Sequence, residues 1–81
     1  MIPSLEVVSR QFPHLRERVA CLFDRDDVFR ELCDDYAVCA EALAQQPASE
    51  GLRREYTALR LRLETELLEY MNDTERRGER D

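Results

Sequence analysis

The chain has 81 residues, of which 37% are charged and 43% hydrophobic, and its formal net charge is −6. This length allows one small domain, 1–81, and the apolar runs are far shorter than the roughly 18–20 residues that a membrane-spanning helix needs. Because all 12 basic residues are arginine and acids outnumber them, the acidic surface disfavours nucleic acid and anionic lipid as partners. With only 2 Gly, 3 Pro and no Trp, the composition predicts an all-α protein, not a turn-rich β-sandwich.

A short N-terminal helical segment is expected within residues 1–12. Ser4 is a suitable N-cap, and Leu5 and Val8 have the spacing of one helix face. Pro13 disfavours helix at the residue before it but fits the first turn of a new helix. The first arm, 13–45, is therefore expected to begin there.

The first arm is expected to break near 24–27. Apolar residues recur every three or four positions before and after this segment, but Asp26 stands where the next apolar residue would fall. A carboxylate on a buried strip is costly, whereas an Asp at the start of a helix caps it. We predict helices at about 13–24 and 27–45. One continuous helix with Asp26 exposed is the alternative.

The second arm follows a loop at 46–51. Pro47 ends the preceding helix and Ser49 is a suitable cap for the next one. Apolar residues then continue with helical spacing over 50–72, which predicts the longest helix of the chain. The tail, 73–81, has no apolar residue and is expected to be mobile.

The short loop predicts that the two arms are antiparallel neighbours, forming a coiled-coil-like helical hairpin. Pairing Leu43 with Leu52 sets the register. Charges of opposite sign then fall at matching levels of the two arms, which supports that register. The expected pairs are Asp34 with Arg62, Arg30 with Glu66, and Glu41 with Arg54.

Several large apolar residues fall outside the strip that pairs the two arms. Because two packed helices bury one strip each, the remaining residues need another cover. Segment 5–23 could supply it within the chain, or another chain could supply it, and the two possibilities do not exclude each other. The predicted interaction residues are Val28, Leu32, Val38, Leu61 and Leu68.

The sequence predicts no catalytic residue, no cofactor, no metal site and no small-molecule substrate. His14 is the only histidine, is expected at the surface, and has no serine or cysteine beside it at a useful spacing. Cys21, Cys33 and Cys39 match no zinc spacing and are expected to be small buried residues. Their odd number, together with an N-terminus that does not read as a signal peptide, predicts a cytoplasmic protein.

The pattern Phe12-Pro13, then Val19 and Leu22, then Phe29-x2-Leu32-x-Asp34 and Leu43, then a loop and Leu52-x6-Leu59-x-Leu61-x-Leu63-x3-Leu67-x2-Tyr70, resembles the YdcH-like family. The resemblance covers roughly residues 12–72. It implies a helical hairpin from a bacterial cytoplasm, in a family of unknown function, and it transfers no catalytic residue. The chain departs from the family in its extension 1–11 and in having Arg, Glu or Thr where the last helix is usually rich in Lys.

The function predicted from the sequence is protein–protein interaction without enzymatic activity. The apolar residues outside the hairpin seam would bind either a second copy or a partner helix. One alternative is a secretion-type co-chaperone or anti-factor that binds a single client. Another is a metal- or redox-responsive regulator that uses Cys33 and Cys39 or the acidic cluster of residues 24–35.

Overall fold

The structure, a computed structural model, describes the backbone of residues 3–79 and the side chains of residues 3–73. It is all-helical, as the composition and periodicity predict, and no strand occurs within the described backbone. The elements in chain order are α1 (Ser4–Gln11), a 3-10 turn η1 (Pro13–Leu15), α2 (Arg16–Arg25), α3 (Asp27–Ala44) and α4 (Glu50–Glu79).

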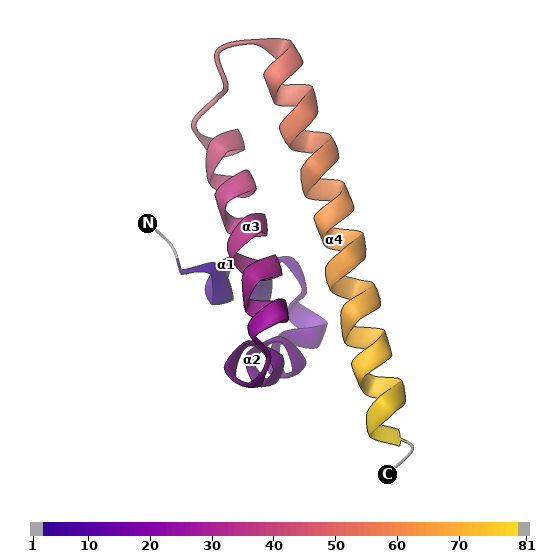
Figure 1. Cartoon of the computed structure of the whole chain (residues 1–81). Helices are drawn as coiled ribbons and strands as arrows, with labels where there is room; N and C mark the ends of the chain where they lie inside the picture. The colour runs from indigo at the N-terminus through magenta and orange to yellow at the C-terminus, as the bar shows by residue number, and fades with distance from the viewer. Residues whose placement is uncertain (1–2, 80–81) are drawn as a thin grey trace.

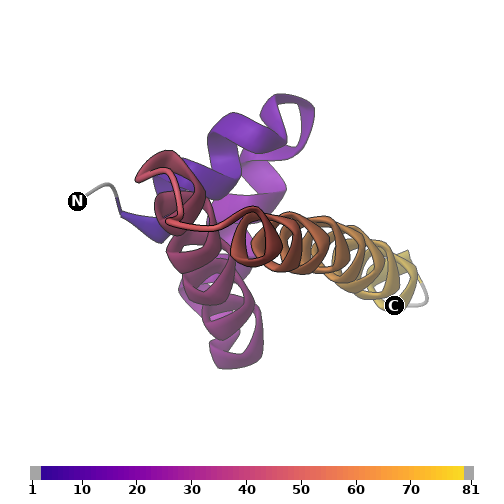
Figure 2. The same cartoon turned by 90° about the horizontal axis from the view of Figure 1, so that it is seen from above.

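Helix α3 is the central element. It packs against α4 along its length, α2 packs against it near the end that is remote from the 45–49 loop, and α1 packs across its middle (Figure 1). Seen from above, α1 and α2 lie together on one side of the α3–α4 pair (Figure 2). The loop end of the molecule therefore consists of two helices, whereas the other end is a packed group of four.

The predicted break between α2 and α3 is confirmed, and the alternative of a continuous helix is wrong. Asp26 is half-buried and has extended backbone angles, φ −127° and ψ 113°. Its Oδ1 accepts hydrogen bonds from the backbone N–H of Val28 at 3.0 Å and of Phe29 at 3.2 Å. These are two of the N–H groups that the first turn of a helix leaves without a partner. The hydroxyl of Tyr70 in α4 also donates to this carboxylate.

Helix α4 begins where predicted but continues beyond the predicted end. Its first turn is capped by Ser49, whose Oγ accepts from Leu52 N–H at 3.1 Å. The expected end at residue 72 is corrected, because the helix runs to Glu79. A helix that already exists adds residues at little cost, and the next positions carry Glu and Arg, which are good helix formers. Residues 80–81 of the expected tail lie outside the described residues.

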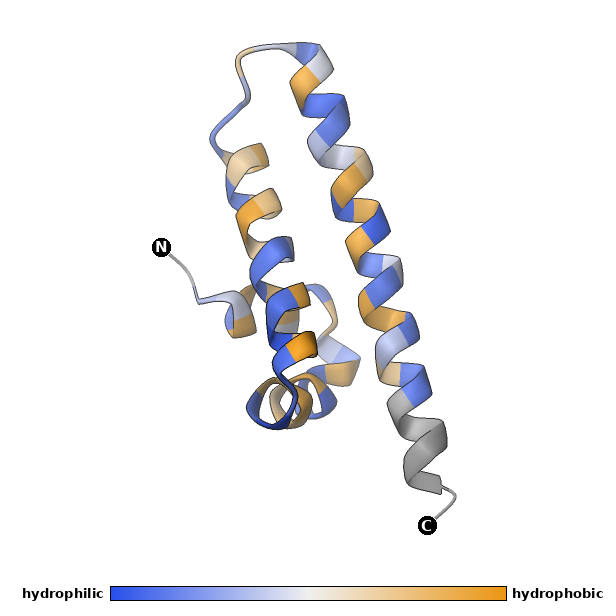
Figure 3. Cartoon of the chain, in the orientation of Figure 1, coloured by the Kyte–Doolittle hydropathy of each residue, from blue (hydrophilic) through white to orange (hydrophobic). Residues whose placement is uncertain are grey.

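The core lies at the four-helix end. All four helices contribute, and Phe29 stacks with Tyr70 at 5.8 Å between ring centroids. Figure 3 shows hydrophobic and hydrophilic residues alternating along α4, as expected for a helix that is buried on one face. Near the loop, Leu52 and Leu59 are more exposed because no third helix covers them. The buried residues are Val8, Val19, Leu22, Phe29, Cys33, Tyr36, Cys39, Leu63, Leu67 and Met71.

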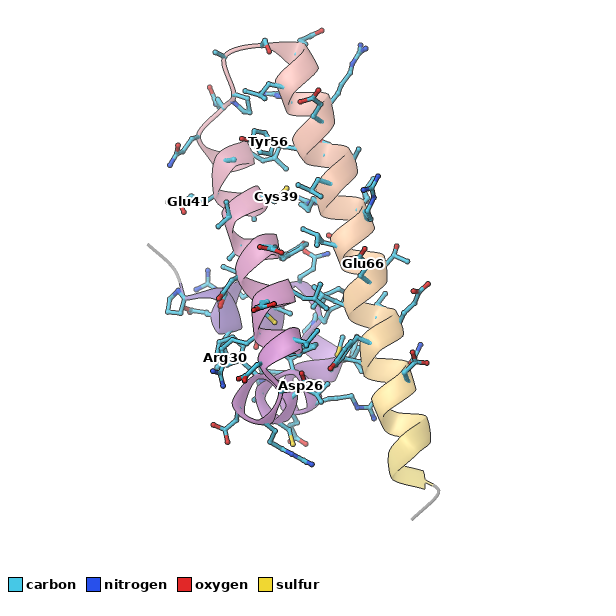
Figure 4. The ribbon with its side chains drawn as sticks, in the orientation of Figure 1. Asp26, Arg30, Cys39, Glu41, Tyr56 and Glu66 are labelled. Atoms are coloured by element: carbon cyan, nitrogen blue, oxygen red, sulfur yellow. The ribbon has the colours of Figure 1, made fainter. Side chains whose placement is uncertain are left out.

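The three ion pairs predicted between the arms are wrong. Arg30 instead donates from Nε and Nη2 to the backbone oxygen of Phe23, at 3.1 and 2.9 Å. Unpaired carbonyls at the end of α2 attract this guanidinium more effectively than a distant carboxylate on α4 does. Asp34 accepts from Ser4 Oγ in α1. Figure 4 shows Arg30 and Glu41 on the side of α3 that faces away from α4. Glu66 belongs to α4.

None of the helices in the described part of the chain combines the length and the apolar character that crossing a lipid bilayer requires.

Candidate interaction surface

Four of the five predicted interaction residues are exposed. Leu32 is the exception: it is half-buried and packs against the core, so cover from within the chain accounts for it. The exposed fraction is 55% for Val28, 65% for Val38, 56% for Leu61 and 38% for Leu68.

The exposed residues do not form one face. Successive residues of a helix are turned by about 100°, so Val38, two positions after the buried Tyr36, points to the opposite side of α3 from the core. Val28, one position before the buried Phe29, lies about a quarter turn from it. Leu61 and Leu68 are seven residues apart and therefore share one side of α4. Among the predicted interaction residues that are exposed, this pair alone shares one helix face.

We call the surface around this pair the outer strip, which consists of Ala58, Leu61, Thr65, Leu68 and Asn72. Its spacing alternates between three and four residues, and its members are exposed and uncharged in a helix that is otherwise rich in charge. The Thr65 hydroxyl donates to the Leu61 backbone oxygen at 3.2 Å, so it needs no outside partner. The two leucines were predicted from the sequence, whereas the smaller residues between and beside them were not. The heptad spacing could have revealed them.

Charges border the outer strip on both edges. On one edge, Glu64 accepts from the Tyr36 hydroxyl at 2.6 Å and approaches Arg60 at 3.5 Å, so it is occupied within the chain. Burial first, and then Glu64, raise the pKa of Tyr36, which keeps this hydroxyl a neutral donor. On the other edge lie Arg62 and Glu69. Among the described side chains, neither of these two makes an ion pair.

Two grooves interrupt the surface elsewhere. One, of about 490 Å³, lies between α1 and α3, and Ala37, Ala40 and Ala44 line it. The other, of about 580 Å³, runs beside η1 and α2, and both His14 and Cys21 line it. His14 is exposed, as predicted. No hydrogen bond joins it to Cys21, whose Sγ accepts from Arg25 Nη1 at 3.6 Å. Nothing in either groove assembles a nucleophile with a base.

The three cysteines lie in two different environments. Burial, and then the nearby Asp34, raise the pKa of the Cys33 thiol to about 12. Burial also raises the pKa of Cys39, although Arg60 acts in the opposite direction, and its thiol donates to the Tyr56 backbone oxygen at 3.0 Å. Cys21 is exposed, so the expectation that all three would be buried is wrong for it. Within the described residues, no three side chains of His, Cys, Asp or Glu converge as metal ligands would.

We expect one fast-reacting thiol in the folded protein. The thiolate is the reactive species, and an elevated pKa together with burial removes it from Cys33 and Cys39 at neutral pH. Titration with a disulfide reagent should show one equivalent reacting quickly and two reacting only after denaturant is added. Cys21→Ser should remove the fast phase. Two or three fast equivalents in the native wild type would contradict this assignment.

Comparison of the chain with protein-family models, with curated proteins and with solved structures gives no match. The surface therefore has to be interpreted from its own geometry.

Proposed function

We propose that the chain is a cytoplasmic, non-enzymatic interaction module that binds a helix, either from a second copy or from another protein, through the outer strip. The observation that carries this proposal is the exposure of Leu61 and Leu68 on one side of α4. Two leucines one heptad apart are the anchors that a partner helix uses. Nucleic acid, membrane and small-molecule ligands are not part of the proposal.

The frame of this module, in our proposal, is an antiparallel coiled-coil-like hairpin of α3 and α4, as in the YdcH-like family that the sequence resembles. Two contacts support the direction of the arms. Tyr36 pairs with Glu64, and Cys39, further along α3, pairs with the earlier residue Tyr56. Contacts that run in opposite order along two helices are typical of antiparallel packing.

The other two predicted functions differ in what they require. A secretion-type co-chaperone or anti-factor would use the same outer strip but would bind a single client and form only a heterocomplex. A metal- or redox-responsive regulator would need accessible thiols, and the burial of Cys33 and Cys39 speaks against that role. We therefore keep the interaction module as the conclusion.

The proposal is tested by the double variant Leu61→Asp, Leu68→Asp. Both side chains are exposed, so the change removes binding surface while costing the helix only about 0.5–1 kcal/mol in propensity. We expect loss of self-association in sedimentation experiments and loss of any protein that the wild-type bait retains from its native cell, with far-UV circular dichroism unchanged. Val38→Asp, at a more exposed position on the far side of α3, is the matched control and should behave as wild type. A double variant that still binds would refute the proposal.

A further inference from the structure

We propose that the partner of the outer strip is the outer strip of a second copy, with the two α4 helices packed in antiparallel orientation. This inference rests on the proposed function and names its partner. It is carried by three features of α4, which are the heptad spacing, the charge polarity of the helix, and one pair of charges that border the strip.

The spacing of the outer strip is that of a coiled-coil seam. Leu61 and Leu68 occupy d positions, and Ala58, Thr65 and Asn72 occupy a positions of the same heptads. Smaller side chains between leucines leave room for leucines of a facing helix to insert. With a two-fold axis level with residues 66–67, Leu68 of one copy packs against Thr65 of the other, and Leu61 packs against Asn72.

The charge of α4 changes sign along the helix. Residues 50–62 carry four arginines and two glutamates, whereas residues 63–73 carry four acidic residues and no basic residue. With the two-fold axis level with residues 66–67, Arg60 and Arg62 of each copy lie level with residues 71–73 of the other copy, which include Asp73. Parallel pairing would place like charges together. In a parallel pair Glu64 of one copy would lie beside Glu69 of the other, so the charges that border the outer strip favour the antiparallel orientation, in which a two-fold interface is possible.

A specific charge pair fits the same geometry. Arg62 and Glu69 lie one heptad apart on one edge of the outer strip, at e positions, where antiparallel helices meet edge to edge. The two-fold axis that packs the leucines of one copy against the outer strip of the other also brings Arg62 of each copy opposite Glu69 of the other. Neither residue has an ion partner among the described side chains of its own chain, so both are available.

The test is a charge exchange at these two positions. Arg62→Glu and Glu69→Arg, each alone, replace two attractive contacts by two repulsive ones in the dimer. We expect each variant to self-associate about tenfold more weakly than the wild type. Mixing the two variants restores both attractions, because one copy then carries two glutamates and the other two arginines. Sedimentation equilibrium should show recovery in the mixture, and native mass spectrometry should show heterodimers in preference to homodimers.

Matched controls are Arg16→Glu and Glu17→Arg, which make the same charge changes on α2 and should leave association unchanged. A monomeric wild type overturns the inference, and so does a mixture that does not recover. Tighter association of Glu69→Arg also overturns it, because in a parallel dimer this change would relieve repulsion from Glu64. The proposed function fails separately, if the Leu61→Asp, Leu68→Asp variant binds whatever the wild type binds.

Discussion

Phe29→Ala is expected to destabilise the fold by about 3–5 kcal/mol, the range for removing a fully buried aromatic side chain. Phe29 has no exposed surface, belongs to the first turn of α3 and stacks with Tyr70 of α4. Small domains are stable by only about 5–15 kcal/mol, and this chain lies at the small end of that class. The variant should therefore lose most of its stability, seen as a large fall in the urea midpoint followed by far-UV circular dichroism.

Val38→Ala is the matched control for this prediction. It truncates an apolar residue of the same helix that is 65% exposed, so it should change stability by no more than about 0.5 kcal/mol. Equal midpoints for the two variants would mean that α3 does not pack as described. An additional comparison with Phe29→Leu, which leaves a smaller cavity, should give an intermediate loss.

The helices could be predicted because each depends on neighbours in the sequence. The break at Asp26 combines an interrupted apolar period with a residue that caps helices, and both signals are local. Ser49 after Pro47 marks the start of α4 in the same way. The end of α4 could not be read from hydrophobicity, because positions 73–79 of the sequence hold no large apolar residue and continue the helix through propensity and continuity with the preceding turns.

The side-chain partners were less predictable, because they depend on where a third element lies. Arg30 was paired with Glu66 from register alone, yet the free carbonyls at the end of α2 are closer to it. Asp34 was expected to face α4 but meets Ser4, because α1 packs against that side of α3. A two-helix picture could not separate these cases, since it has no α1 or α2.

Asp26→Ala is expected to destabilise the fold by about 2–4 kcal/mol, an unusually large effect for a residue between two helices. The carboxylate caps α3 through the N–H groups of Val28 and Phe29, and loss of an N-cap costs about 0.5–2 kcal/mol. It also accepts from the Tyr70 hydroxyl, and a hydrogen bond to a charged group contributes about 1.5–3 kcal/mol. One side chain thus links the start of α3 to α4, and thermal or urea unfolding measures the loss.

Two companion variants separate these contributions. Asp27→Ala is the matched control, because its side chain is almost fully exposed and makes only a long ion pair with Arg30, 3.6 Å from Nη1 to Oδ1. It should cost at most about 0.5 kcal/mol. Tyr70→Phe removes the cross-helix hydrogen bond and keeps the ring that stacks on Phe29. If the structure is right, Tyr70→Phe destabilises the wild type but has a much smaller effect in the Asp26→Ala background. Equal effects in both backgrounds would show that Tyr70 and Asp26 do not interact.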